Sequence, residues 1–265
     1  DGGDELFMGY ETFSWLDKID AVPVFLKGFI SFLMNKLPID ILISKDLNRQ
    51  INKALKYSLM DKADLIFSLN SILDLKDLKK VTNQTSFYWL KELKKELNAN
   101  KNDSFSIMQN FLIKVSLSGD MLRKVDGMTM ANSIEVRVPL LDNRVIDFAL
   151  SLPLDFLYKD GIKKKILKDV AKKYLPEDVI SHKKWGFSIP MHKVLEKEFI
   201  EKFKYLYEKF KVLDMKFVSR FYRYKANNSR DIHTLYSQYT IDHVNWMIIL
   251  FYRWLEKKAV LVENK

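Results

Sequence analysis

Apolar residues recur along the chain mainly at intervals of three and four, the spacing of one face of an α-helix. The clearest examples are Val145, Phe148, Ala149 and Leu152 in one stretch, and Val244, Ile248, Phe251 and Leu255 in another. Strand-like alternation, in which every second residue is apolar, is nearly missing. The sequence therefore predicts a mainly α-helical chain of roughly ten helices.

Residues that begin or end helices support this pattern. Prolines stand where helical patterns start or stop, at Pro23, Pro38, Pro153 and Pro176. We expect Asp142 or Asn143 to cap the helix that follows them, and Ser104 to cap the run after "NKNDS". Two stretches, 98–103 and the one around Asn227, read as loops.

Composition narrows the class of protein. The chain has 265 residues, of which 48% are hydrophobic, enough for one large domain or two modest ones. The absence of cysteine excludes a disulfide framework and a thiolate metal site. The most apolar stretches are short and are interrupted by Lys27 or Arg253, so we expect a cytoplasmic protein without a membrane span.

The net charge of +10 raises the question of a nucleic-acid partner. Lysines alternate with glutamates in segments such as "LKELKKEL", a pattern typical of solvated helix faces. No nucleic-acid-binding motif accompanies the charge, so we do not expect such a surface. A basic helical interaction module without catalysis remains an alternative.

The first candidate site is the opening "DGGDE". Asp1, Asp4 and Glu5 stand at i, i+3 and i+4, and two glycines lie between the first two. If a helix begins near Asp4, its first amides and the flexible Gly2 and Gly3 can approach a phosphate closely. Carboxylates beside a phosphate indicate Mg²⁺. The alternative is structural: Asp4 caps the helix and Glu5 favours its dipole.

The second candidate stretch runs from Lys124 to Pro153. Pro139 pushes Val138 toward an extended conformation, so the chain leaves one helix, runs extended and starts another. Arg137 needs a partner there, and the structural interpretation is an ion pair with Glu135, Asp126 or Asp142.

The third candidate stretch is "SHKKWGFSIP", from Ser181 to Pro190. A lysine held beside a glycine in a loop can reach an anionic intermediate as a mobile charge. The alternative is a surface turn with solvated lysines.

Together the three stretches resemble the synthetase half of glutamine-hydrolysing asparagine synthetases. Members of that family carry segments like "SGDGGDELFGGY", "KVDRMSMANSLEVRVPFLD" and "RKKxGFGVP". This chain has "DGGDELFMGY", "KVDGMTMANSIEVRVPLLD" and "HKKWGFSIP" in the same order. The close matches cover residues 1–10 and about 117–195, whereas 11–116 and 196–240 match only in helical character.

The resemblance implies a place within a larger domain. In the family, "DGGDE" lies late in an α/β adenine-nucleotide α-hydrolase-like (PP-loop) domain, after a parallel sheet with an SGGxDS loop. Here "SLSGD" at 116–120 lacks the second glycine and the Asp-Ser. The resemblance also implies that the family's amino-terminal glutaminase domain, which starts with a nucleophilic cysteine, is not part of residues 1–265. The resemblance therefore implies that residues 1–265 form the helical C-terminal part of a synthetase domain, inactive alone.

The resemblance also implies an activity. The family activates aspartate with Mg-ATP as an aspartyl-adenylate, and ammonia released from glutamine then gives asparagine and AMP. By motif position, Asp4 would bind Mg²⁺ and Asp1 would orient the acyl substrate or the amine. Lys184, next to Lys183, would be the catalytic lysine. Gly2, Gly3 and Lys184 would contact ATP or pyrophosphate.

Other residues would support this site or depart from the family pattern. Asp126, Glu135 and Arg137 would lie near the site in structural roles. Gly127 stands where the family usually has a basic residue. Met8 replaces a glycine, which we expect to be a change in packing.

The resemblance leaves the acyl substrate and the assembly open. Relatives amidate other carboxylates, including sugar acids, and a related amidotransferase is therefore the alternative enzyme. A homodimer is also considered.

Overall fold

The computed structural model describes residues 1–23, 26, 28, 56–82, 87–99, 103–182 and 238–263. The chain divides into two compact units. Unit 1 comprises Asp1–Leu26, Asp61–Ile66 and Lys91–Trp185, and unit 2 comprises Lys27–Met60, Phe67–Leu90 and Gly186–Lys265.

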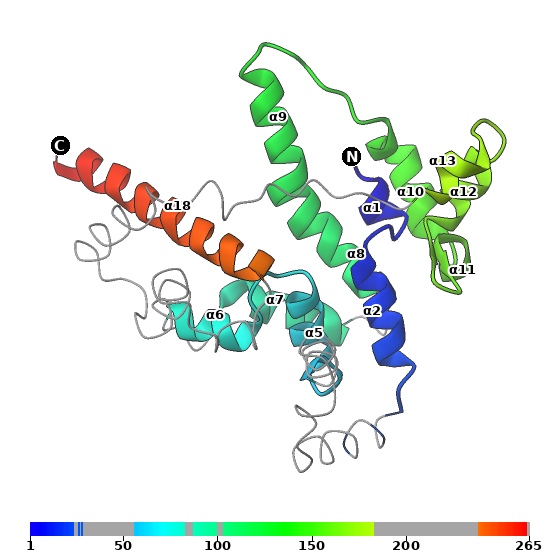
Figure 1. Ribbon diagram of the computed structural model, residues 1–265, viewed down its shortest axis with the longest axis horizontal. Helices are drawn as coiled ribbons and strands as arrows, with labels where there is room; N and C mark the ends of the chain where they lie inside the picture. Colours follow the sequence, from blue (N-terminus) through cyan, green and yellow to red (C-terminus); the bar gives the residue numbers. More distant parts are fainter. Residues whose placement is uncertain are drawn as a thin grey trace. The chain divides into compact units, whose positions relative to one another are not determined.

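Unit 1 is built mainly from helices. In chain order these are α1 (Gly3–Leu6), α2 (Glu11–Asp20), α8 (Ser104–Phe111), the π-helix η2 (Leu112–Met121), α9 (Leu122–Met130), the 3₁₀ helix η3 (Pro139–Leu141), α10 (Asn143–Ser151), α11 (Leu154–Leu157), α12 (Lys165–Ala171) and α13 (Glu177–Ser181). α8, η2 and α9 follow one another without a break, as the long green run in Figure 1 shows. π-Helical turns are rare and often mark functional sites, and η2 contacts α1.

A short hairpin stands between α11 and α12. Strands β1 (Tyr158–Lys159) and β2 (Ile162–Lys163) pair antiparallel, with Tyr158 opposite Lys163. Asp160 and Gly161 connect them, with φ angles of 51° and 77°. Positive φ at both positions is what a two-residue type I′ turn requires, and Asp-Gly is a preferred pair for it.

The core of unit 1 forms where α2, α8 and the hairpin meet. Phe13 of α2 stacks on Phe105 of α8 with ring centroids 6.1 Å apart, and Phe105 also contacts Tyr158 of β1 at 5.4 Å. All three side chains are buried. The Tyr158 hydroxyl donates to Asp17 Oδ2 at 3.0 Å, which satisfies its polar end. These contacts hold the hairpin against the first twenty residues of the chain.

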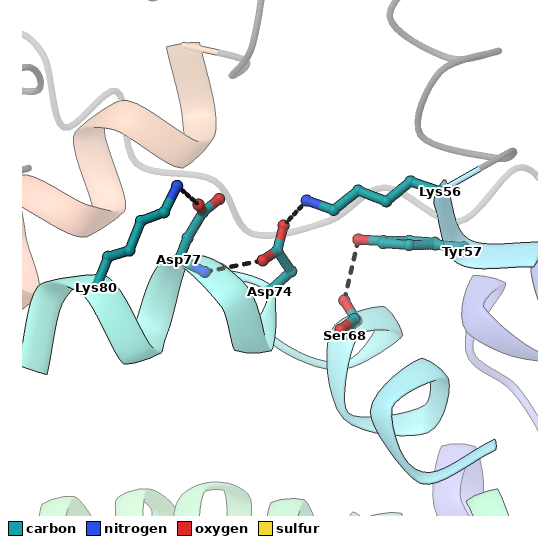
Figure 2. A network of polar contacts seen from close by, with 6 residues as sticks. All are labelled: Lys56, Tyr57, Ser68, Asp74, Asp77 and Lys80. Carbon is teal, nitrogen blue, oxygen red and sulfur yellow. Dashed lines mark hydrogen bonds and ion pairs between the residues drawn. The ribbon is translucent and has the colours of Figure 1, made fainter. Parts of the chain in front are cut away.

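Unit 2 contains α6 (Leu75–Thr82) and α18 (Gln238–Glu263), while α5 (Lys62–Leu69) and α7 (Tyr88–Ala99) are divided between the units. Figure 2 shows the polar network at the start of α6. Asp74 accepts a hydrogen bond from the Asp77 amide at 3.0 Å and pairs with Lys56. The Tyr57 hydroxyl donates to the carbonyl oxygen of Ser68 at 3.2 Å. The network ties the residues before α5 to α6.

The mainly helical prediction is confirmed, and the period of three and four identifies α18, in which Val244 and Ile248 are buried. The predicted caps are partly right. Asp142 caps α10 by accepting from the Arg144 amide at 3.0 Å. Ser104 is not the cap of α8, because it is already the first residue of the helix. The N-cap is Asp103, whose side chain accepts from the Ser106 amide at 2.9 Å.

Prolines precede helices as expected. Pro153 and Pro176 stand immediately before α11 and α13. Pro38 lies outside the described residues. None of the described helices combines the length and the apolar character needed to cross a membrane.

Candidate active site

The opening Asp-Gly-Gly-Asp forms a tight turn into the four-residue helix α1. Gly2 is the N-cap residue, with φ +87°, and makes no side-chain cap. A Cβ on Gly2 would clash with the Leu141 side chain, and one on Gly3 would stand 3.1 Å from Leu140 Cδ1. Packing against η3 therefore explains why glycine stands at both positions, because a side chain there would collide with η3. Their contact with a phosphate stays a prediction.

The structural alternative, in which Asp4 caps the helix, is wrong, because the N-cap residue of α1 is Gly2. Its carboxylate forms an ion pair with Lys164, with Oδ1 and Nζ 3.0 Å apart. Both side chains remain partly accessible, at 23% and 31% exposure. A Cβ built on Gly3 would stand 3.9 Å from Lys164 Nζ, so the ammonium also lies close to the first turn of α1. The turn thus presents a carboxylate and a cation side by side.

Lys164 reaches this place because of the hairpin that precedes it. It is the N-cap residue of α12 and has φ +53°, which is uncommon for a residue with a side chain. Its amide donates to the carbonyl oxygen of Phe7 at 3.1 Å. A Cβ on Gly9 would clash with both Asp4 Oδ1 and Lys164 Cε. Glycine at position 9 therefore leaves the room that the ion pair occupies.

A buried carboxylate and a half-buried tyrosine support the same turn. Glu5 is only 2% exposed, and its carboxylate accepts a hydrogen bond from the Tyr10 hydroxyl. Burial, the hydrogen bond to Glu5 and the charges of Glu5, Asp4 and Asp120 raise the pKa of Tyr10 well above its ordinary value. Tyr10 consequently stays a donor at neutral pH. From α8, buried Gln109 donates to the carbonyl oxygen of Leu6 at 2.7 Å.

The turn offers residue types that suit magnesium and phosphate, a carboxylate and a lysine, side by side. Within the described ranges, no three carboxylate, histidine or cysteine side chains gather closely enough to hold a metal ion by themselves. Mg²⁺ bound with nucleotide needs only one or two carboxylates, since phosphates and waters complete its shell. The accessible carboxylate of Asp4 fits that role, and Lys164 fits a phosphate oxygen beside it.

Of the other predicted site residues, only some lie within the described part of the chain. Asp1 is exposed at the first position. Lys183 and Lys184 lie outside the described residues. Arg137 pairs with Glu135, as the structural interpretation predicted, but both side chains are largely exposed. Exposed pairs contribute little to stability, so this pair does not fix the extended segment.

Asp126 and Gly127 lie exposed on α9. Asp142 pairs with Arg144, with Oδ1 and Nε 3.0 Å apart, and not with Arg137. Among the described residues, no hydrogen bond or ion pair joins Asp126, Glu135 or Arg137 to α1.

Met8 departs from the family pattern in more than packing. The side chain is buried at 2% exposure, as a packing change would give. Its backbone also has φ +54°, a region that glycine enters without strain and methionine does not. The packing expectation is therefore incomplete, because this substitution also alters backbone strain.

A glycine-rich turn that offers a carboxylate and a lysine together defines a class of site suited to an anion carried with a divalent cation. Comparison with known proteins gives the family: the model described as asparagine synthase matches residues 1–256. The chain belongs to the asparagine synthase family.

Individual relatives agree with this assignment. Asparagine synthetase [glutamine-hydrolyzing] 1 of Bacillus subtilis is 31% identical over 213 residues, covering 76% of this chain and 32% of that protein. The asparagine synthetase of Rattus norvegicus is 38% identical over 80 residues, 29% of this chain and 14% of its own length. The chain thus spans about a third or less of these relatives. No solved structure gave a significant match.

Sequence reasoning missed Lys164 and the Glu5–Tyr10 pair. The dipeptide Asp160-Gly161 is a strong hairpin signal and could have placed a turn before Lys164. Its pairing with Asp4, which is distant in sequence, depends on tertiary structure that no local pattern contains. From the sequence, Glu5 was explained by its favourable interaction with the helix dipole. A charged residue gives no sign in the sequence that it will be buried, so the burial of Glu5 was not predicted.

Proposed function

We propose that this chain takes part in ATP-dependent amide formation, in which a carboxylate substrate, aspartate in the leading case, is activated by ATP. One carboxylate oxygen attacks the α-phosphorus and pyrophosphate leaves, giving an acyl-adenylate. Ammonia from glutamine then attacks the acyl carbon and AMP leaves with the original carboxylate oxygen. We further propose that the chain forms the helical part of a PP-loop synthetase domain.

The observation that carries this proposal is the Asp4–Lys164 pair beside Gly3. In the proposed site, Asp4 would hold Mg²⁺, which neutralises phosphate charge when bound. Lys164 would pass from the Asp4 carboxylate to a phosphate oxygen, a short movement for a flexible ammonium. A cation that lies beside the leaving pyrophosphate acts where negative charge develops. Membership of the asparagine synthase family supports the same reaction class.

Asp1 and Lys184 complete the proposal through the resemblance alone. Asp1 is assigned to orienting the acyl substrate or the incoming amine, and Lys184 to stabilising charge during adenylation. Aspartate is the proposed substrate because relatives carry the name asparagine synthetase. A sugar acid or another carboxylate remains the alternative, to be decided by the substrate assay.

The experiment measures aspartate-dependent pyrophosphate release from ATP in a complete synthetase that contains this chain. Asp4→Asn should weaken the response to Mg²⁺, because an amide is a poorer ligand than a carboxylate. Lys164→Ala should lower the rate about a hundredfold or more. Lys168→Ala, one turn further along α12, is the matched control and should be mild. Unchanged Mg²⁺ dependence and rate in both site variants would contradict the proposal, whereas glutamine hydrolysis should persist in all three.

A further inference from the structure

We propose that Tyr10 and Glu5 are positioning residues that fix the Asp4 carboxylate, and that they influence nucleotide binding only through Asp4. The inference rests on the proposed function, since Asp4 is assigned there to Mg-ATP. Both residues lie within the first motif, but the resemblance gave neither of them a role in the reaction.

Glu5 is a buried carboxylate. A carboxylate at 2% exposure has lost nearly all of its water, and it needs hydrogen-bond donors inside the protein. Tyr10 supplies one of them through its hydroxyl. Glu5 follows Asp4 directly, and Tyr10 follows Gly9, whose missing side chain makes room for the Asp4–Lys164 pair. The hydrogen bond therefore joins the residue after Asp4 to the residue after Gly9, next to the backbone bond that closes the turn from Asp4 to Gly9.

The backbone of this turn is held by hydrogen bonds from residues outside α1. The Gly9 amide donates to the Asp4 carbonyl oxygen at 2.8 Å. Gln109 holds the carbonyl oxygen of Leu6, and the Lys164 amide holds that of Phe7. A four-residue helix is too short to be stable by itself, so the orientation of Asp4 depends on these tethers.

The Tyr10–Glu5 bond acts nearer to Asp4 than the tethers from α8 and the hairpin do, because Glu5 directly follows Asp4. Gln109 and the Lys164 amide fix the backbone at residues 6 and 7, after Asp4. The Tyr10–Glu5 bond instead holds the side chain next to Asp4 and closes the segment from residue 5 to residue 10, which overlaps the turn that the Gly9 amide closes on Asp4. Replacing Tyr10 by phenylalanine removes this bond and keeps the ring. The turn from Asp4 to Gly9 should then become more mobile.

The first arm of the test uses this 265-residue chain and follows hydrogen–deuterium exchange of backbone amides. Tyr10→Phe should speed exchange of the Gly9 amide about fivefold to tenfold, as expected from loss of one hydrogen bond. Tyr158→Phe is the matched control. It removes a tyrosine–carboxylate bond of the same unit, to Asp17, and should leave the Gly9 amide unchanged. Equal exchange at Gly9 in Tyr10→Phe and the unaltered chain would overturn the proposal.

The second arm measures Mg-ATP affinity by titration calorimetry in the complete synthetase, as a double-mutant cycle. Tyr10→Phe should weaken binding about fivefold to tenfold with Asp4 present, and should have no effect with Asp4→Asn. A general loss of structure would instead weaken binding equally in both backgrounds, and that result would overturn the positioning role. If Asp4→Asn itself leaves affinity unchanged, the proposed function fails, and the exchange arm alone decides whether the pair holds the turn.

Discussion

At the scale of single residues, two glycines separate the effect of backbone conformation from that of available space. A Cβ would meet nothing within 4 Å at either Gly127 or Gly161. Gly127 lies inside helix α9, whereas Gly161 has φ +77° in the hairpin turn. Gly127→Ala should raise the free energy of unfolding by about 0.5–1 kcal/mol, because alanine favours the helix. Gly161→Ala should lower it by about 1 kcal/mol or more, because alanine is strained at that φ. Urea unfolding measures both, and a loss of stability in Gly127→Ala would contradict the helical assignment.

The adjacent lysines of the third motif also call for a residue-scale test, which depends on the family resemblance. Lys184→Ala should reduce amide formation about a hundredfold to a thousandfold, since one fixed charge at the transition state is lost. The melting temperature should barely change. Lys184→Arg should restore little activity, because a planar guanidinium differs from a compact ammonium in reach and shape. Lys183→Ala is the control and should be mild; if it abolishes activity while Lys184→Ala spares it, the motif alignment is displaced by one residue.

At the scale of elements, the start of α6 should make the protein sensitive to acid. Asp74, with a side chain only 10% exposed, pairs with Lys56 (Figure 2). Burial would raise the pKa of Asp74, but the Lys56 ammonium and the Asp77 amide outweigh it, so the pKa lies below its usual value. As pH falls, the unfolded state therefore binds more protons than the folded state. The free energy of unfolding that this pair contributes is fully present above about pH 4, and it is lost as pH falls through the pKa of Asp74 in the folded state.

Lys56→Met tests this account by denaturant unfolding across pH. The variant should be less stable than the unaltered chain at pH 7, and it should lose less stability between about pH 5 and pH 2. Lys95→Met, which removes an exposed pair with Glu92, should change little. Parallel pH curves for the unaltered chain and Lys56→Met would exclude Asp74 as the source of the acid sensitivity.

The elements also show where sequence patterns succeed. The period of three and four predicts α18 and much of α10, because a helix face that packs on a core repeats at that interval. Phe148 nevertheless has an exposed side chain, so periodicity identified the helix more reliably than its buried face. The hairpin was missed because two-residue strands are too short for alternation, although its Asp-Gly turn is a local signal.

At the scale of the whole molecule, the three motifs identified the family but not the construction of the turn. The resemblance drew attention to Asp4, and the family match supports the resemblance. The partner of Asp4 could not be predicted, because Lys164 reaches it only through the hairpin and the bond to Phe7. Likewise, Phe13, Phe105 and Tyr158 form one core from three distant segments. Such contacts are set by tertiary packing, which local periodicity does not encode.

The most direct measurement follows an oxygen atom through the proposed reaction. The complete synthetase is given ATP, glutamine and aspartate labelled with ¹⁸O in its side-chain carboxylate, and the products are analysed by mass spectrometry. Activation by adenylation predicts unlabelled pyrophosphate, asparagine that keeps one labelled oxygen, and AMP that carries the other. Formation of ADP with ¹⁸O in inorganic phosphate, or asparagine formed while AMP stays unlabelled, would contradict the account.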